Sequence, residues 1–216
     1  MNFATIDAEL VAKLLLLLLI GMGPKIALVP FLEKTKSFDA DTQRAVGRRM
    51  VITAVVTALI LLVTGALLMR LLHITSGAVG VAGGIILALL AIKMAMGQAD
   101  EPPVTEKVPV DVKKVAVYPL AIPYLLNPVG ITVIIIASDS VLSIASAALV
   151  VGLILLVGAL DYLVFSNIDK LAKRLNPTSL VISEVVFGIL LTAVAVQLTV
   201  AGLARLGLVA AQGAIH

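Results

Sequence analysis

The sequence predicts an all-α integral membrane protein with six transmembrane helices, arranged as two inverted three-helix repeats with broken helices in spans one and four. Three observations lead to this fold class. The 216 residues are 61% hydrophobic and 13% charged, whereas a soluble domain carries about a quarter charged residues. The apolar residues fall into runs long enough to cross a bilayer. Two of these runs are interrupted by prolines and glycines, and their prolines align at one sequence offset.

Six runs of apolar residues are the predicted spans. They lie at about 10–32, 50–72, 77–97, 115–137, 142–165 and 178–206. The stretch 98–114 is charged and contains prolines, which predicts a solvated cytoplasmic linker between a first repeat, 1–97, and a second repeat, 115–216. The first run contains LLLLLLI, but the acidic Asp7 and Glu9 before it differ from the positive n-region of a signal peptide, which indicates a retained span.

Positive charge predicts the orientation of the chain. The connections after spans one and five and the central linker together hold eleven lysines and arginines, and the opposite side holds three. Basic residues accumulate on the cytoplasmic side of membrane proteins. We therefore expect a multi-pass protein of the cytoplasmic membrane with both termini external.

The two interrupted runs read LIGMGPKIALVPFL at 19–32 and IPYLLNPVGITVIII at 122–136. Pro24 and Pro128 are 104 residues apart, and so are Gly84 and Gly188, although spans two and five do not keep this offset. Each half holds an odd number of spans, so the second half is inverted relative to the first, a common design of secondary transporters. The two interruptions are then expected to face each other near the middle of the bilayer.

The residues at the two interruptions are the predicted substrate site. Freed backbone amides there can hold a carboxylate, and freed carbonyls can hold an ammonium group or a cation. The candidate substrate-binding residues are Gly23, Pro24, Lys25, Asn127, Pro128, Gly130 and Thr132. Asn127 has the best case, since it combines central depth with a following proline and a side chain that both donates and accepts. For Lys25, a place in the pocket and a structural ion pair are equally consistent with the sequence.

Four further polar residues inside the spans are candidates for a supporting role around the site: Lys93, Asp161, Glu184 and Gln197. An ionisable residue within a span is a functional candidate by default. The first three lie near cytoplasmic ends, however, where they can stay in contact with water, so a structural or interfacial role is favoured for them. Gln197 is interpreted as a packing contact, and the glycine stripe within 77–84 predicts close helix packing.

The chain resembles the MarC family, and four stretches carry the resemblance in the order expected for that family. They are GPKIALVPFL, AVGVAGGIILALLAIKM, VYPLAIPYLLNPVGITVII and FGILLTAVAVQLTVAGL. The resemblance implies a six-span secondary transporter that exports or exchanges small neutral amino acids such as glycine and alanine. Two positions depart from the family pattern. Gly23 stands where members usually have Asp or Asn, and Asn127 to Gly130 stand where they commonly have Gly-Pro-Gly.

Two other classes of function stay open at this point. One is a metal-ion or other small-solute exporter of the same architecture, with Asp139, Asp161 and Glu184 as ligands, but these acids are scattered and neither cysteine nor a suitably placed histidine joins them. The other is an intramembrane enzyme or a scaffold. No Ser–His or paired-aspartate motif supports catalysis, so we expect no enzymatic activity.

The sequence also predicts which partners the protein has. They are a small zwitterionic substrate, H⁺ or Na⁺ as the candidate coupling ion, and the lipid bilayer. We expect no cofactor, no metal site and no nucleic-acid partner, and nothing resembling a nucleotide-binding loop points to an ATP-driven pump. A homo-oligomer is compatible with the sequence, which does not specify the oligomeric state.

Overall fold

The structure is a computed structural model that describes residues 7–96, 111–141, 143–168 and 177–209, with only the backbone described at 177–181 and 184. The described residues form helices and no strand. Five helices are long and apolar enough to cross a membrane, and a bent pair, Val112–Leu125 with Pro128–Ser140, provides a sixth span if it is counted as one. The prediction of an all-helical membrane protein is therefore confirmed, with five to six candidate spans.

The helices follow one another along the chain as α1 (Ala8–Met22), α2 (Pro24–Thr35), α3 (Ala40–Leu71), α4 (Ser76–Ala95), α5 (Val112–Val115), the wide-turned η1 (Ala116–Leu125), α6 (Pro128–Ser140), α7 (Ile144–Ser166) and α9 (Pro177–Arg205). Helix α3 begins ten residues before the predicted second span, because Asp39 caps it by accepting a hydrogen bond from the Thr42 amide at 3.2 Å. Residues 98–110 of the predicted linker, 98–114, lie outside the described residues. Its last residues already belong to a helix, which Asp111 caps.

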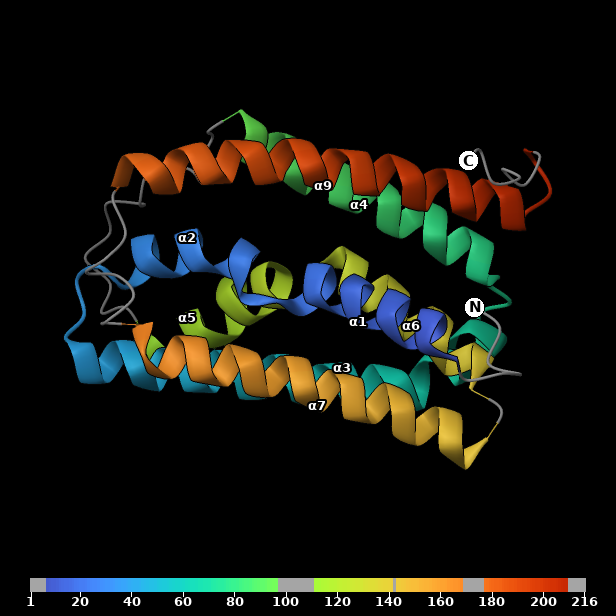
Figure 1. Ribbon diagram of the computed structural model, residues 1–216, viewed down its shortest axis with the longest axis horizontal. Helices are drawn as coiled ribbons and strands as arrows, with labels where there is room; N and C mark the ends of the chain where they lie inside the picture. The colour runs from blue at the N-terminus through green and yellow to red at the C-terminus, as the bar shows by residue number, and fades with distance from the viewer. Residues whose placement is uncertain (1–6, 97–110, 142, 169–176, 210–216) are drawn as a thin grey trace.

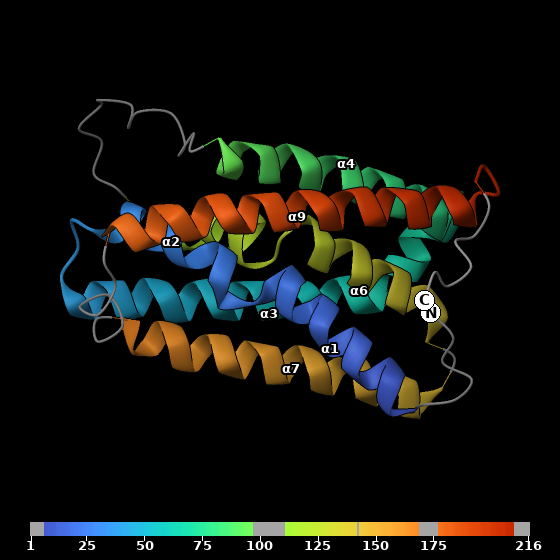
Figure 2. The same cartoon turned by 45° about the horizontal axis from the view of Figure 1, so that its top comes forward.

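The helices form three layers (Figure 1). Helices α4 and α9 lie along each other on one side, α3 and α7 lie on the opposite side, and α1, α2, η1 and α6 fill the space between them. Figure 2 shows α4 and α9 along each other again after rotation, with α3 and α7 farther from them. The start of α1 and the end of α9 lie at the same end of the molecule. The interrupted spans are thus enclosed between two pairs of uninterrupted helices.

The layer of α4 and α9 is held by close contact between small residues. A Cβ atom on Gly77 would meet the Gly202 carbonyl oxygen at 2.9 Å, and one on Gly80 would meet the Gly202 Cα at 3.2 Å. Near the other end of the pair, a Cβ on Gly188 would meet the Ala95 amide nitrogen at 2.5 Å. Backbones approach this closely only where side chains are missing, as in small-residue interfaces of membrane helices. The glycine stripe within 77–84 therefore packs as the sequence predicts.

The chain leaves helical geometry between α1 and α2. Helix α1 ends at Met22, Gly23 has the extended angles φ −82° and ψ 163°, and α2 begins at Pro24. Proline suits the first position of a helix, where its missing amide costs no hydrogen bond. A Cβ on Gly23 would fall on the Leu19 carbonyl, to which the Gly23 amide donates at 3.0 Å. The close carbonyl accounts for a glycine at this position.

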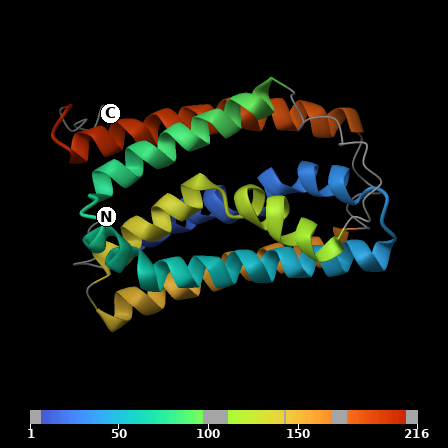
Figure 3. The same ribbon diagram turned by 180° about the vertical axis from the view of Figure 1, so that it is seen from behind.

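Span four is more irregular than the sequence predicts. Tyr118 and Ile122, each of which precedes a proline, have extended angles inside η1, because a proline disfavours the helical region for the residue before it. The chain leaves helical geometry again at Leu126, and the helical parts before and after this point are bent by 72°. Figure 3 shows this bend between the light-green turns of η1 and the yellow helix α6.

Candidate functional site

The two interruptions of spans one and four meet in direct backbone contact. The Asn127 amide donates to the Gly21 carbonyl at 2.9 Å, and the Asn127 Nδ2 donates to the Ile20 carbonyl at 2.7 Å. A Cβ on Gly21 would fall on the backbone of Gly130, and a Cβ on Gly130 would fall on the Gly21 carbonyl. The absence of side chains at these two glycines lets the end of α1 touch the beginning of α6. We call this contact the junction.

The side chain of Asn127 holds the junction together. It is fully buried, with 0% of its surface exposed. Its Oδ1 accepts hydrogen bonds from the amides of Val129 at 2.8 Å and Gly130 at 3.3 Å, so it caps α6 where the first amides have no partner within the helix. One amide side chain therefore both caps α6 and binds the end of α1. Whether it also contacts a substrate stays a prediction.

Five of the other candidate substrate-binding residues lie around the junction. Gly23, Pro24, Pro128 and Gly130 lie at the two interruptions, where the sequence places them. Thr132 lies one turn into α6, where it is buried and so close to α4 that a Cβ on Gly83 would fall on its Oγ1. These residues are brought together around the junction.

Lys25 lies apart from this group. Its side chain is exposed, and its Nζ lies 5.4 Å from the centre of the Phe187 ring on α9. An ammonium group over an aromatic face is attracted by the negative face of the ring. The structure thus gives Lys25 an aromatic neighbour, a contact that neither of the alternatives drawn from the sequence includes.

The structure disperses the four supporting candidates. Lys93 on α4 and Gln197 on α9 are exposed, and Glu184 lies in α9 with its side chain outside the described residues. Asp161 is fully buried, with 0% of its surface exposed, whereas the sequence predicts a position in contact with water near the membrane surface. Helical spacing explains the difference, because Asp161 lies four residues before the buried Phe165 on the same inward face of α7.

A cleft of about 590 Å³ runs between α1, α6 and α9. Residues from Asp7 to Ile20 of the first span line it on one side, and Val129 brings its inner end to the junction. The complete lining consists of Asp7, Glu9, Leu10, Lys13, Leu17, Ile20, Val129, Val133, Ile136, Val194, Gln197, Leu198, Ala201 and Arg205. This volume lies within the range of about 300–1,000 Å³ that small-molecule sites occupy.

The outer part of the cleft carries charges of both signs. Asp7 and Glu9 lie at the start of α1, Lys13 one turn further on, and Arg205 at the end of α9. Further in, the lining becomes mostly apolar, with Gln197 as a polar group on the wall. The sequence indicates these charges only as residues at span ends, because it is the fold, with α1 and α9 on the walls of one cleft, that brings Arg205 and Glu9 to the same site.

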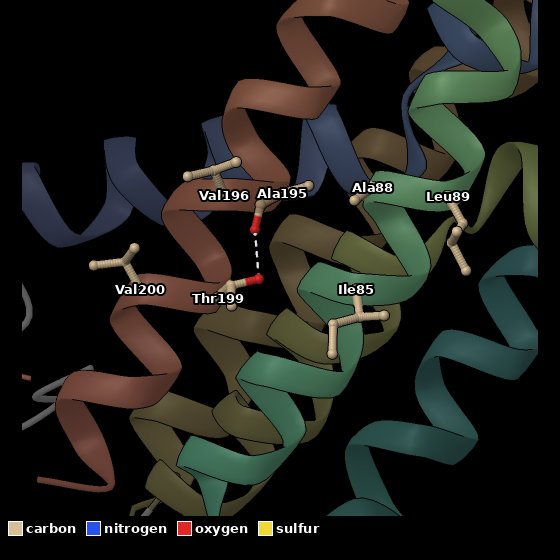
Figure 4. A pocket seen from close by; sticks show the side chains of 7 residues that line it. All are labelled: Ile85, Ala88, Leu89, Ala195, Val196, Thr199 and Val200. Carbon is tan, nitrogen blue, oxygen red and sulfur yellow. Dashed lines mark hydrogen bonds between the residues drawn. The ribbon is translucent and has the colours of Figure 1, made fainter. Parts of the chain in front are cut away.

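A second, smaller groove of about 280 Å³ lies between α4 and α9 (Figure 4). It is lined by Ile85, Ala88, Leu89, Ala195, Val196, Thr199 and Val200. The hydroxyl of Thr199, the polar side-chain group of this lining, donates within its own helix to the Ala195 carbonyl at 2.9 Å. The groove therefore presents an apolar surface that suits hydrocarbon rather than a charged ligand.

The apolar spans, the layered helices and the cleft that ends at the junction define a multi-pass helical membrane protein. The family model described as MarC family integral membrane protein matches residues 8–206. The chain belongs to the MarC family.

Relatives from archaea and bacteria agree with this assignment. A UPF0056 membrane protein of Methanocaldococcus jannaschii is 28% identical over 184 residues, which cover 84% of this chain and 90% of the relative. Another of Pyrococcus horikoshii is 25% identical over 195 residues, or 88% of this chain and 94% of the relative. A third, of Aquifex aeolicus, is 26% identical over 200 residues, or 91% and 94% of the two chains. No solved structure matches the chain.

Proposed function

We propose that this protein is a secondary transporter, an exporter or exchanger of small neutral amino acids across the cytoplasmic membrane, and that it catalyses no chemical reaction. The observation that supports this proposal most strongly is the cleft that runs along α1 from a mouth of mixed charge to the junction. Transporters with interrupted helices bind their substrates where the interruptions meet, near the middle of the bilayer.

The arrangement of the helices supports an inverted repeat. Pro24 and Pro128, separated by 104 residues, are each the first residue of the second helical part of their span. The second spans of the two halves, α3 and α7, form one outer layer, and the third spans, α4 and α9, form the other. A two-fold axis in the membrane plane would exchange the halves in this arrangement. The first half, 1–97, and the second, 115–216, would then rock against each other to open the site alternately to either side.

The chemistry of the cleft suits a small zwitterion. An amino acid at its mouth meets carboxylates that attract its ammonium group and a lysine and an arginine that attract its carboxylate. The apolar walls further in accept a short aliphatic side chain, and the inner end of the cleft lies beside the amino end of α6. Helix amino ends favour anionic groups such as a substrate carboxylate. Glycine and alanine are therefore the expected substrates, with H⁺ or Na⁺ as the coupling ion.

The charge bias of the connections supports an orientation in which the mouth of the cleft faces the exterior. Asp7 and Arg205 are located beside the two termini, which the positive-inside rule assigns to the outer surface. A metal-ion exporter is the second candidate. It is less favoured because, within the described residues, no three His, Cys, Asp or Glu side chains lie close enough together to hold a metal ion.

Exchange in proteoliposomes tests the proposed function. Liposomes containing the purified protein and loaded with unlabelled alanine should take up labelled alanine and glycine, because an exchanger returns one substrate for another. Labelled lysine and glutamate, and liposomes without protein, are the controls. Uptake no faster than in protein-free liposomes for every neutral amino acid would contradict the proposal, and metal-ion flux in the same liposomes would favour the second candidate.

A further inference from the structure

Asp161 is a buried acidic residue, and the packing of α7 does not require an acid at this position. It is fully buried on α7, and among the described residues neither of its carboxylate oxygens has a hydrogen-bond partner. Its neighbours on the inward face of α7, Ile154, Val157 and Phe165, are all fully buried apolar residues. Helical spacing directs these side chains to one face. An apolar residue at position 161 would complete that face without the cost of burying a carboxyl group.

Helix α7, which carries Asp161, packs chiefly against α3 and also touches both parts, α1 and α2, of the span that is interrupted at Gly23. One turn from Asp161 toward the end of α7, the Phe165 ring lies 5.0 Å from the Phe31 ring of α2, centre to centre. The end of α7 leads into the connection after span five, which its positive charges assign to the cytoplasm, so this aromatic pair lies on the cytoplasmic side of Asp161. A displacement of α2 about Gly23 would separate the two rings.

No charged group of the packed helices compensates Asp161. The ionisable side chains of these helices are Glu9 and Lys13 on α1, Lys25, Glu33 and Lys34 on α2, Asp41, Arg44, Arg48, Arg49 and Arg70 on α3, and Tyr162 beside it on α7. The Arg48 guanidinium lies 5.8 Å from the centre of the Tyr162 ring, but no member of this set bonds to the Asp161 carboxyl. A buried carboxylate without water or a partner has nothing to replace its lost hydration, and such a group is stable only as the neutral acid.

We propose that Asp161 is the proton-binding group that couples transport to the proton gradient, an inference that rests on the proposed transport function. In the conformation described here the carboxyl holds its proton. When α2 moves away and water enters, the O–H bond breaks, the electron pair stays on the carboxylate and the proton passes to water on the cytoplasmic side. The carboxylate takes up its next proton from the external side before it is buried again, so each cycle moves one proton inward and links that movement to the displacement of α2.

Three proteins in liposomes test this coupling: the unmutated chain, Asp161→Asn and Asp41→Asn. Asparagine imitates the neutral acid but releases no proton, and Asp41 is an exposed carboxylate on α3 that pairs with Arg44 at 3.2 Å. We expect Asp161→Asn to exchange alanine and to lose the accumulation of alanine that a pH gradient drives, while Asp41→Asn keeps both activities. Asp161→Glu, which retains a titratable group, should keep gradient-driven accumulation. Gradient-driven accumulation by Asp161→Asn at the unmutated level would overturn the proposal.

An infrared measurement keeps the inference separate from the transport proposal. The purified chain should show a carbonyl-stretch band of a protonated carboxylic acid near neutral pH that is missing in Asp161→Asn and present in Asp41→Asn. Absence of that difference would overturn the proton-binding role even if both proteins transport alanine. If the unmutated chain exchanges no amino acid, the transport proposal and the coupling role fail together, while the band still decides whether Asp161 holds a proton.

Discussion

Replacing Asn127 by alanine is expected to lower both the thermal stability and the transport rate of this protein. The change removes the cap of α6, which costs about 0.5–2 kcal/mol in measured helices. It also leaves the Ile20 carbonyl, which accepts from Nδ2 at 2.7 Å, without its partner in a buried place, at a cost of about 1–3 kcal/mol. Thermal unfolding of the purified protein in detergent, followed by size-exclusion chromatography of the remaining fraction, measures the first effect.

Asn167→Ala is the matched control for this change. Asn167 follows the end of α7 and donates to the Leu163 carbonyl at 2.9 Å, so the same type of residue loses the same type of hydrogen bond, but at an exposed position. Its replacement should leave the unfolding temperature almost unchanged, because water satisfies the freed carbonyl. An Asn127→Ala protein that unfolds at the unmutated temperature would contradict the role of Asn127 at the junction.

Replacing Gly21 by valine should also lower the stability of the protein. The Cβ of the new side chain would overlap the backbone of Gly130. Backbone atoms cannot change rotamer to relieve the overlap, as a flexible side chain can. Helices α1 and α6 would have to separate, with the loss of the Asn127 amide bond to the Gly21 carbonyl. Overpacking of this kind typically costs about 1–3 kcal/mol and occasionally more. The yield of monodisperse protein and the unfolding temperature measure the effect.

Gly152→Val on α7 provides the comparison. An added Cβ at Gly152 meets nothing within 4 Å, so the substitution introduces a side chain of the same size where space is open. We expect this variant to fold in normal yield. Equal stability of the Gly21 and Gly152 variants would show that the two interrupted spans do not touch in the way described.

The sequence was sufficient to predict the membrane class and the family. Apolar runs and the residue types Gly23, Pro24 and Pro128 act locally, through hydropathy and through the limits that proline imposes on its neighbours. The cap formed by Asn127 also had a local signal, since asparagine directly before a proline is a typical helix start. The depth of Asn127 in the bilayer predicts a substrate contact, whereas its capping chemistry predicts the hydrogen bonds at the start of α6.

The cleft and the burial of Asp161 could not be predicted in the same way. Arg205 and Glu9 lie almost a whole chain apart in the sequence and share the cleft only because the fold places α1 and α9 on its walls. Asp161 lies near the end of an apolar run, where a position at the membrane surface is the ordinary expectation, but the packing of α2 and α3 against α7 covers it. Both features depend on tertiary contacts, which local sequence patterns do not specify.

The accessibility of Gln197 tests the central claim most directly, namely that the cleft is the external part of a transport path. The chain contains no cysteine, so Gln197→Cys introduces a single thiol, eight residues or about 12 Å along α9 from Arg205. Leu163→Cys, on the exposed outer face of α7, is the control that faces lipid. A membrane-impermeant thiol reagent added outside intact cells should label Gln197→Cys, alanine should slow that labelling, and Leu163→Cys should stay unlabelled. A Gln197→Cys protein that is not labelled from outside, or that is labelled at the same rate with and without alanine and the other neutral amino acids, would contradict the account.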